Sequence, residues 1–487
     1  MSPHAPLALR HGPFACYLQP MDGCPDLAPL ASALSSETPL VWLDSARQHP
    51  VTGRWSLLGC HPWLTLRARG DRVELRTSAA SQTFREDPLD ALRQVLQRYE
   101  TRPRAVPHAR ALGLMGCLSY DLNRWIERLP PPQPDEDPVP ELLWFGMRGA
   151  VLLDHLEQRS WLISIVDPHR PAPEARREAL VLMERLHATL GNPPPLSSMP
   201  SPEPVSLEAT TTQPDFEAMV RRTLEDIRAG EIFQANLSQR FTGRWRGPAF
   251  PLYGALRAIN PSPFAGFLSS DDCAVVSCSP ERLVRVQEGR VDTRPIAGTR
   301  PRGATPAEDA LNSLDLLLSE KERAEHIMLV DLARNDLGRV CATGSVQVNE
   351  LLALEGYSHV IHIVSDVCGR VRPGVDAVDV IRAVFPGGTI TGCPKVRCMQ
   401  LLREREPVPR GLYTGSLGYL GFDGTMDLNI AIRTMVIRHG RLSFHVGAGI
   451  VADSDPAREY HETLAKAGAL VDAIRTFDGP TVHAGTR

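Results

Sequence analysis

Residues 415–452 read GSLGYLGFDGTMDLNIAIRTMVIRHGRLSFHVGAGIVA. Three mainly apolar runs are separated by two turn dipeptides, Asp423-Gly424 and His439-Gly440. Dipeptides of this kind between apolar runs predict tight turns joining antiparallel strands. We therefore expect a meander of three strands, over Gly415–Phe422, Met426–Ile437 and Leu442–Ala452.

Helices are predicted on both sides of this meander. A 3.6-residue apolar period predicts helices that begin after Asp215 and end at Gly230, and that cover Pro306–Leu318, Lys321–Leu332 and Pro456–Ile474, the last capped by Asp455. Further strands are expected over Ile232–Phe241 and Tyr357–Ser365. Because strands and helices do not alternate regularly, the fold class is α+β.

The 487 residues suit two or three domains or one large composite domain. Residues 191–206 (GNPPPLSSMPSPEPVS) are rich in Pro and Ser and predict a linker or loop. This linker separates an N-terminal region, 1–190, from a C-terminal region, 207–478, which is followed by a short tail, 479–487.

Composition excludes several classes of protein. The net charge of -4 provides no basic field for nucleic acid or for an anionic membrane surface. No run of 18 apolar residues suggests a membrane span, and residues 1–20 lack the pattern of a signal peptide. The ten cysteines include no C-x-x-C pair, so we expect neither a zinc site nor a disulfide framework, and a reducing cytoplasm is the expected location.

Two acidic pairs are candidates for a metal site. Glu322 and Glu325 are three residues apart in one predicted helix, and Glu459 and Glu462 have the same spacing in another, with Lys466 on the same face. Converging carboxylates are the hard oxygen ligands that Mg²⁺ prefers. The same spacing also suits a solvated charged helix face, and the spacing by itself leaves both interpretations open.

Other polar and glycine-rich features suggest an anionic ligand. Arg433 interrupts an apolar run, which indicates either a buried ion pair or contact with an anion. Glycines at 447 and 449 inside a predicted strand are typical of close approach by a ligand or another backbone. Residues 295–303 and 385–395 are glycine-rich turns without a Walker A or dinucleotide motif. His362 is a candidate acid or base, on the opposite face of its predicted strand from His359.

Eight motifs in fixed order resemble those of the chorismate-utilising enzymes. They are FQANLSQRF (233–241), SPERL (279–283), PIAGTRPRG (295–303), KERAEHIMLVDLARNDLGRV (321–340), YSHVIHIVS (357–365), FPGGTITGCPK (385–395), MDLNIAIRT (426–434) and GAGIVADSDP (447–456). In the N-terminal region VWLDSA (41–46), GRWSLLG (53–59) and SYDLNRWIERLP (119–130) resemble the family's ammonia-using branch. The resemblance implies a large two-lobed fold, with antiparallel sheets packed face to face and helices on the outside.

The resemblance also assigns roles to residues. Glu322, Glu325, Glu459 and Glu462 would surround Mg²⁺, directly or through water, and the ion would act as a Lewis acid on the ring carboxylate of chorismate. The enolpyruvyl carboxylate would be held by Tyr413, Arg433 and the backbone of Gly447, Ala448 and Gly449. Lys466 would lie near the ring carboxylate, His362 would be the general acid for departure of the ring hydroxyl, and Gly298, Thr299 and Asn236 would line the pocket.

Gln234 indicates which nucleophile is used. Relatives that add water have a lysine at this position to activate it, and a glutamine amide cannot act as a base. The resemblance therefore implies ammonia, delivered by a separate glutamine amidotransferase subunit, since no cysteine here lies in a glutaminase-like motif.

Two amination reactions fit this branch. Asn236, Cys393, Leu428-Asn429 and residues 125–130 resemble enzymes that aminate the para carbon and keep the enolpyruvyl group, which is the aminodeoxychorismate synthase reaction of folate synthesis. Ala297 instead resembles anthranilate synthases, because many para-aminating relatives have a lysine there. We expect para-amination; the alternatives are anthranilate formation and a non-catalytic paralogue that only binds chorismate. Asp44 and Ser45 lie where relatives bind tryptophan and mark a possible tryptophan pocket.

Overall fold

The computed structural model describes residues 6–102, 107–135, 138–193, 205–356 and 360–477. Two large antiparallel sheets diverge from a shared pair of long strands, β4 (Trp55–Arg69) and β8 (Leu142–Asp154), which pair from Trp55↔Asp154 to Ala68↔Leu142. The register of this pair shifts between Pro62 and Leu64, beside His61 at φ 55°. A bulge of this kind bends a strand, and here it lets each half of β4 and β8 enter a different sheet.

The first sheet extends from the Trp55 end of β4. Its order is β1–β2–β9–β8–β4–β3–β12–β13–β22–β23–β11, with β10 and β19 at the edge. The bounds not yet given are β1 Leu7–His11, β2 Phe14–Asp22, β3 Leu40–Asp44, β9 Arg159–Ile165, β10 Glu208–Ala209, β11 Gln234–Arg244, β12 Phe264–Ser269, β13 Ala274–Ser279, β19 Gly392–Cys393, β22 Thr434–Arg438 and β23 Arg441–Ile450.

The second sheet extends from the Arg69 end of β4. Its order is β6–β5–β4–β8–β7–β20–β21–β14–β15–β18, and β18 also pairs with β16 and β17. These strands are β5 Arg72–Thr77, β6 Ser81–Arg85, β7 Gly113–Leu118, β14 Arg282–Gln287, β15 Arg290–Thr293, β16 Ile296–Pro301, β17 Gln347–Gly356, β18 Val360–Arg370, β20 Ser416–Gly421 and β21 Met426–Asn429. In each sheet the strands of the N-terminal region form one half and the strands that follow residue 207 form the other, and the halves meet at β3 and β12 in the first sheet and at β7 and β20 in the second.

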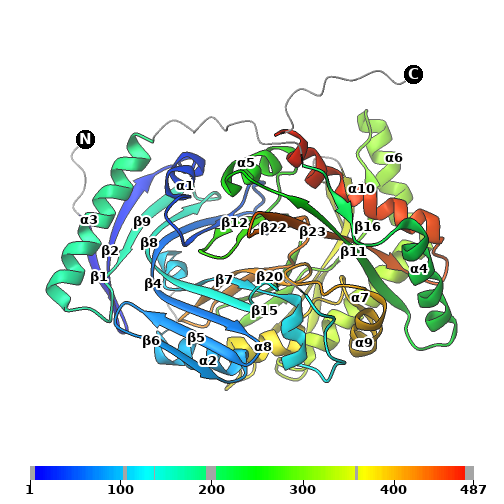
Figure 1. Ribbon diagram of the computed structural model, residues 1–487, viewed down its shortest axis with the longest axis horizontal. Helices are drawn as coiled ribbons and strands as arrows, with labels where there is room; N and C mark the ends of the chain where they lie inside the picture. The colour runs from blue at the N-terminus through cyan, green and yellow to red at the C-terminus, as the bar shows by residue number, and fades with distance from the viewer. Residues whose placement is uncertain (1–5, 103–106, 136–137, 194–204, 357–359, 478–487) are drawn as a thin grey trace.

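Helices cover the outer faces of the sheets, as expected (Figure 1). Helices α1 (Ala28–Leu34), α3 (Ala172–Gly191), α5 (Ala249–Ile259) and α10 (Pro456–Arg475) pack on the first sheet, and α2 (Pro88–Arg98), α7 (Glu320–Gly338) and α8 (Ala377–Val384) pack on the second. One core, which includes Trp42, Phe267 and Leu470, lies under the helices of the first sheet. A larger core lies between the sheets and beneath α2 and α8.

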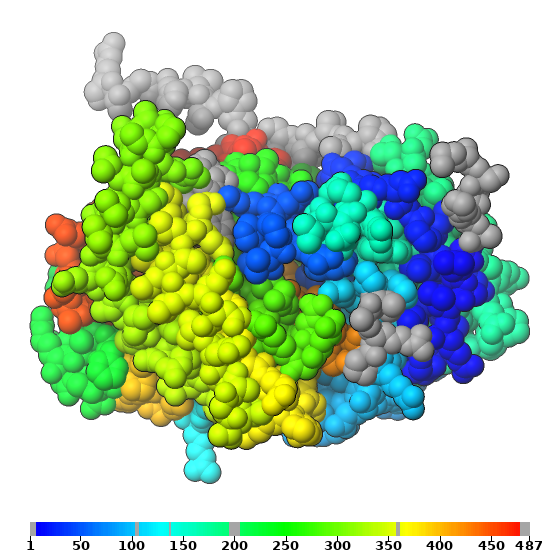
Figure 2. Space-filling view, turned by 180° about the vertical axis from the view of Figure 1, so that it is seen from behind, coloured from blue at the N-terminus to red at the C-terminus, as the bar shows by residue number. Residues whose placement is uncertain are grey.

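Three further helices complete the fold beside β11 and β16. Helices α4 (Gln213–Arg228) and α9 (Lys395–Arg405) enclose a small core with β11, in which Phe216, Leu237 and Leu402 are buried. Helix α6 (Pro306–Leu318) contacts mainly β16 and α7 and projects from the surface (Figure 2). Short 3-10 helices cover Pro107–Ala111 and Tyr120–Trp125.

The predicted strand Met426–Ile437 is wrong. Strand β21 ends at Asn429 and β22 begins at Thr434. The intervening residues cross between the sheets, because β21 pairs with β14 of the second sheet and β22 with β13 of the first. Arg433 has φ 51°, a conformation that interrupts a strand. The sequence reads as one apolar run because both halves are buried.

Two local predictions are also corrected. Helix α4 is capped by Thr212, whose side chain accepts from the backbone N–H of Asp215, so Asp215 is not the cap. Residues 296–301, expected as a turn, form β16, in which Gly298 at φ 72° lies at a register shift. In contrast, the bounds of α6 and the Asp455 cap of α10 are confirmed.

The predicted helix over Lys321–Leu332 is confirmed, and α7 continues to Gly338. Within the described ranges, no helix is long and apolar enough to cross a membrane. Most of the predicted linker lies outside the described residues, as does His359.

Candidate functional site

The floor of the site is formed by neighbouring strands β11 and β23. Side chains alternate between the faces of a strand, so Gln234 and Asn236 share a face with Gly447 and Gly449, and the backbone of Ala448 lies between those glycines. A Cβ at Gly447 would come within 2.5 Å of the Asn236 Oδ1 atom and 2.7 Å of the Tyr413 hydroxyl. A Cβ at Gly449 would come within 2.9 Å of the Gln234 Nε2 atom. Because glycine has no Cβ, the side-chain amides of Gln234 and Asn236 and the hydroxyl of Tyr413 can lie in contact with the backbone of β23.

Two buried acceptors on this floor find no hydrogen-bond donor among the residues that the structure describes. The Oε1 atom of Gln234 and the Oδ1 atom of Asn236 are both enclosed and unsatisfied. A buried unsatisfied amide costs about 1–3 kcal/mol. Such atoms are typical of a site that a polar ligand or ordered water completes.

Cationic groups lie at one end of the floor. Burial lowers the pKa of Arg433, and the group that opposes this effect is the phenol of Tyr413. Among the described residues Arg433 makes no ion pair with an acidic side chain. The Nζ atom of Lys466 donates to the Gly447 carbonyl at 3.0 Å and pairs with Glu462 at 2.7 Å. The uncompensated guanidinium makes this end attractive to a carboxylate.

Tyr413 is fixed on the wall of the site by its neighbours. Its ring stacks on His445 with 5.2 Å between centroids, and its side chain is buried. Burial raises the pKa of Tyr413 to about 12, so its hydroxyl stays protonated and can donate a hydrogen bond.

Strands β16 and β18 form the opposite wall. Their register places Thr299 beside His362, and the Thr299 Oγ1 atom lies 3.0 Å from His362 Nδ1. The same Nδ1 atom lies 3.2 Å from the Gly298 carbonyl oxygen. Because a carbonyl oxygen only accepts, this contact requires a proton on Nδ1. Burial lowers the pKa of His362, and the cations Arg433 and Lys466 lower it further, so the imidazole is neutral near pH 7.

The two predicted acidic pairs lie close enough to interact electrostatically, an arrangement that their spacing alone left open. Burial raises the pKa of Glu325, and the carboxylates of Glu322, Glu459 and Glu462 raise it further. Ion pairs hold three of the four groups, joining Arg300 to Glu322 at 3.0 Å, Lys321 to Glu325 at 3.9 Å and Lys466 to Glu462 at 2.7 Å. The Oε2 atom of Glu459 is buried and has no hydrogen-bond partner within the described part of the chain.

This acidic cluster fits a hard divalent cation. The donors are all carboxylate oxygens, and an added dication would offset the repulsion that raises the pKa of Glu325 and Glu459. Within the part of the chain that is described, no three His, Cys, Asp or Glu side chains are already arranged around one point as ligands. Mg²⁺ commonly takes one or two carboxylates and completes its shell with water and substrate oxygens, so the cluster matches that mode.

Sequence reasoning missed Glu281, the acid of the SPERL motif. Its carboxyl is 5 % exposed, accepts from the Thr389 hydroxyl at 2.8 Å and is hydrogen-bonded by the backbone of Ile296, next to Ala297. Burial raises its pKa to about 7, so it can hold or release a proton near neutral pH. A carboxylate directly after a strand of buried residues was the available signal.

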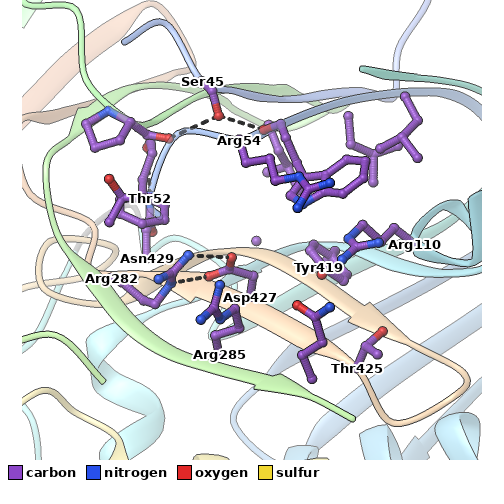
Figure 3. Close-up of a pocket in the computed structure, with 18 of the residues that line it drawn as sticks. Ser45, Thr52, Arg54, Arg110, Arg282, Arg285, Tyr419, Thr425, Asp427 and Asn429 are labelled. Carbon is purple, nitrogen blue, oxygen red and sulfur yellow. Dashed lines mark hydrogen bonds and ion pairs between the residues drawn. The ribbon is translucent and has the colours of Figure 1, made fainter. Parts of the chain in front are cut away.

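A separate cavity of about 320 Å³ lies between the two sheets and contains Ser45 (Figure 3). Arg54, Arg110, Arg282 and Arg285 contribute to its lining, and Arg282 forms a bidentate pair with Asp427 at 2.9 and 3.0 Å. Asp44 also lines it, but the Asp44 carboxylate is bound by the Tyr253 hydroxyl at 2.8 Å and Arg257 at 2.6 Å. A ligand amine in the cavity would therefore compete with Arg257 for that carboxylate.

The residues used to choose between the two amination reactions are dispersed. Asn236 lies on the floor of the site, and Cys393 pairs with Gln234 across β19 and β11. Asn429 instead lines the second cavity, and the indole of Trp125 donates to Glu141 at 3.0 Å. Ala297 lies one residue before Gly298 in β16.

Comparison with known proteins identifies the family. The model of the chorismate binding enzymes matches residues 44–472. The chain is 47% identical to an anthranilate synthase component I-like protein of Synechocystis, covering 74% of this chain and 72% of that protein. It is 40% identical to anthranilate synthase component 1 of the same organism, covering 89% and 90%.

A relative of the second kind matches equally well. Aminodeoxychorismate synthase component 1 of Bacillus subtilis is 40% identical, covering 91% of this chain and 93% of that protein. The crystal structure of anthranilate synthase component I from Streptococcus pneumoniae TIGR4 superposes with a TM-score of 0.77 at 33% identity, covering 87% and 93%. Matched relatives named as anthranilate synthases are more numerous than those named as aminodeoxychorismate synthases.

Proposed function

This chain belongs to the chorismate-binding enzymes, and from that premise we propose that it is the catalytic component of an aminodeoxychorismate synthase. In the proposed reaction ammonia replaces the para hydroxyl of chorismate and the enolpyruvyl group is retained. The observation that supports an anionic substrate most directly is Arg433, a partly buried cation beside Tyr413 that has no acidic partner within the described residues. We assign the enolpyruvyl carboxylate to Arg433 and the Tyr413 hydroxyl.

Ammonia as the nucleophile is supported by Gln234. Its unsatisfied Oε1 atom faces the floor of the site and can accept a hydrogen bond from an N–H donor. An amide has no basic atom with which to deprotonate water, whereas neutral ammonia needs no activation before it attacks. Within this proposal Gln234 and Asn236 orient the amine.

Para-amination is supported by Asn236 and Cys393, which lie at the site and resemble the para-aminating relatives. The aminodeoxychorismate synthase component 1 of Bacillus subtilis is as similar to the chain as the anthranilate synthase component 1 of Synechocystis, each at 40% identity. Ala297 and the larger number of anthranilate synthases among the relatives favour the second candidate, in which chorismate gives anthranilate and pyruvate.

The proposed metal is Mg²⁺, held near Glu322, Glu325, Glu459 and Glu462. When bound, it would act as a Lewis acid toward the ring carboxylate. Lys466 would hold the same carboxylate after its ion pair with Glu462 is exchanged. A proton for the departing hydroxyl can come from His362 only after that neutral imidazole has gained one, whereas Glu281, with a pKa of about 7, is partly protonated at neutral pH. We therefore add Glu281 to His362 as a candidate proton donor.

The proposed partner is a separate glutamine amidotransferase chain. Relatives named component 1 or component I are described as one part of a larger enzyme. The second cavity remains a candidate tryptophan site around Ser45, in which the Asp44 carboxylate would have to be released by Arg257.

Product identification tests the proposal. The purified chain is incubated with chorismate, Mg²⁺ and ammonium at alkaline pH, and the products are separated and identified by mass spectrometry. The expected product retains the enolpyruvyl group and yields 4-aminobenzoate with a lyase. Anthranilate and pyruvate would replace the proposal with the second candidate, and bound but unconverted chorismate would identify a non-catalytic paralogue.

A further inference from the structure

A buried ion pair lies beside the floor of the site, next to Ser238 of β11. Arg410 and Glu406 have side chains that are only 1% and 6% exposed, and they form a two-pronged pair in which Nε donates to Oε2 and Nη2 to Oε1, each at 2.8 Å. Neither residue belongs to the motifs that identified the family. Buried pairs contribute little net stability compared with apolar replacements, so stability alone does not account for this one.

The guanidinium of Arg410 connects three segments of the site. Besides Glu406, it donates to the Asn236 carbonyl oxygen at 2.5 Å, to the Ile390 carbonyl oxygen at 2.9 Å and to the Thr414 hydroxyl at 3.3 Å. These contacts and the pair with Glu406 engage every nitrogen of its planar fork. Asn236 is on the floor, Ile390 is in the glycine-rich turn, and Thr414 follows Tyr413.

The carboxylate of Glu406 extends the connection to β11. Its Oε1 atom accepts from both the backbone N–H and the hydroxyl of Ser238, each at 2.8 Å. Ser238 is the register partner of Gly447, the residue whose bare backbone faces Asn236 and Tyr413. The guanidinium also lies 5.6 Å from the centre of the Tyr413 ring. One ion pair therefore contacts β11 at Asn236 and Ser238, the glycine-rich turn at Ile390 and the segment that carries Tyr413.

We propose that Arg410 and Glu406 are positioning residues that set the relative placement of Asn236, Tyr413 and the turn at Ile390, and thereby the affinity for chorismate. The inference rests on the proposed function. It requires the fork geometry of arginine and not only its charge, because a lysine ammonium cannot reach the Glu406, Ile390, Thr414 and Asn236 acceptors at once. Neither residue contacts the four carboxylates of the acidic cluster, so the pair should leave the metal requirement unchanged.

The test compares the wild type with Arg410→Lys, Glu406→Gln and a control, Arg405→Met. Arg405 is the last residue of α9, directly before Glu406, and forms a 2.7 Å ion pair with Asp226, away from the site. For each protein we would measure the dissociation constant for chorismate by titration calorimetry, KM and kcat with ammonium, the half-saturating Mg²⁺ concentration and the thermal midpoint.

Arg410→Lys and Glu406→Gln should each raise the chorismate dissociation constant and KM at least tenfold, with the half-saturating Mg²⁺ concentration within twofold of wild type. Arg405→Met should alter only the thermal midpoint. Retention of wild-type affinity by Arg410→Lys, or an equal rise in the dissociation constant and KM in Arg405→Met, would overturn the assignment. A wild type that binds chorismate but gives no product would count against the proposed function alone, since the dissociation constants still test the pair.

Discussion

At the scale of single residues, Arg433 illustrates how an unpaired charge indicates function. Its guanidinium is partly buried without an acidic partner in the described residues, and its backbone has φ 51°. Both features cost free energy in the unliganded protein, since burying a charge and adopting a left-handed backbone are each unfavourable. An anionic ligand would offset the first of these costs.

We predict that Arg433→Ala weakens chorismate binding roughly 10- to 100-fold, the range expected for losing hydrogen bonds to a charged group. Because no carboxylate is left unpaired by the substitution, the thermal midpoint should be equal to or above that of wild type. Arg433→Lys keeps the positive charge but loses the forked guanidinium, so its affinity for chorismate should lie between those of the wild type and Arg433→Ala. Calorimetric titration with chorismate measures the effect, and an unchanged dissociation constant in Arg433→Ala would remove the residue from the binding site.

Glu281 gives a prediction about pH and stability. Burial raises its pKa in the folded protein to about 7 from an ordinary value of 4.5. The contribution of the neutral Glu281 carboxyl to the free energy of unfolding is therefore complete below about pH 4.5. It is lost as pH rises through about 7, where the buried carboxyl must ionise. The shift corresponds to a loss on the order of 3 kcal/mol. Glu281→Gln should flatten this part of the curve of unfolding free energy against pH, measured by urea denaturation from pH 5 to 8.

Suppose that Glu281→Gln loses activity at every pH but has the same curve of unfolding free energy against pH as the wild type. The carboxyl of Glu281 would then be ionised from pH 5 to 8 and could not be a proton donor. Thr389→Val serves as the matched control, because it removes the hydrogen bond to the carboxyl and leaves the titrating group. Since that hydrogen bond lowers the pKa, Thr389→Val should move the transition to higher pH.

At the scale of elements, helix periodicity was the most informative part of the sequence. The spacing of Glu322 and Glu325 and of Glu459 and Glu462 predicted that each pair shares a helix face, and α7 and α10 confirm those helices. That the two faces converge depends on how the helices pack on the sheets, which no local pattern encodes. The prediction that the two acidic pairs face each other came from the family resemblance and not from periodicity.

Strand predictions were weaker for a physical reason. Residues 426–437 are buried on both sides of a crossing between sheets, so the apolar run continues where the strand stops. Glu281 was missed because the burial that raises its pKa comes from residues distant in sequence, such as Thr389. Arg410 and Glu406 were missed for the same reason, as their partners lie on β11 and in the glycine-rich turn.

Helix α10 gives the prediction at this scale. Glu462→Gln should remove one of the converging carboxylates and raise the half-saturating Mg²⁺ concentration at least tenfold or abolish turnover. The matched control is Asp472→Asn on the same helix, whose side chain is 61% exposed and pairs with Arg475. Steady-state rates across a Mg²⁺ series provide the measurement. Full activity of Glu462→Gln at low Mg²⁺ would exclude the residue from the metal site.

At the scale of the whole molecule, the two sheets place the candidate site and the second cavity on opposite sides of one short segment. Glu281 is beside β16 at the site, and the next residue, Arg282, lines the cavity and pairs with Asp427. A ligand that disturbed the Arg282–Asp427 pair would therefore act on the backbone that carries Glu281. The lining of the cavity and the candidate proton donor are therefore consecutive residues of the chain.

The cysteines of the whole chain bear on whether it could release ammonia from glutamine by itself, as the proposed reaction would otherwise require of a partner. A glutaminase needs a cysteine thiol of lowered pKa. Here burial raises the pKa of nine cysteines, which are Cys16, Cys24, Cys60, Cys117, Cys273, Cys278, Cys341, Cys393 and Cys398. We predict that the isolated chain turns over chorismate with ammonium and not with glutamine, at any glutamine concentration, and that a glutamine amidotransferase chain restores glutamine use.

Thiol alkylation sharpens this prediction. Treatment of the isolated chain with iodoacetamide at neutral pH should leave ammonium-dependent turnover unchanged, because the thiols are protonated and mostly enclosed. The same treatment of the reconstituted complex should abolish glutamine-dependent turnover by modifying the partner, while ammonium-dependent turnover persists. Release of glutamate from glutamine by the isolated chain, measured by a coupled dehydrogenase assay, would contradict the prediction that a separate chain supplies the glutaminase. Loss of ammonium-dependent turnover after alkylation would instead place a reactive cysteine in the site itself, such as the half-buried Cys393 beside Gln234.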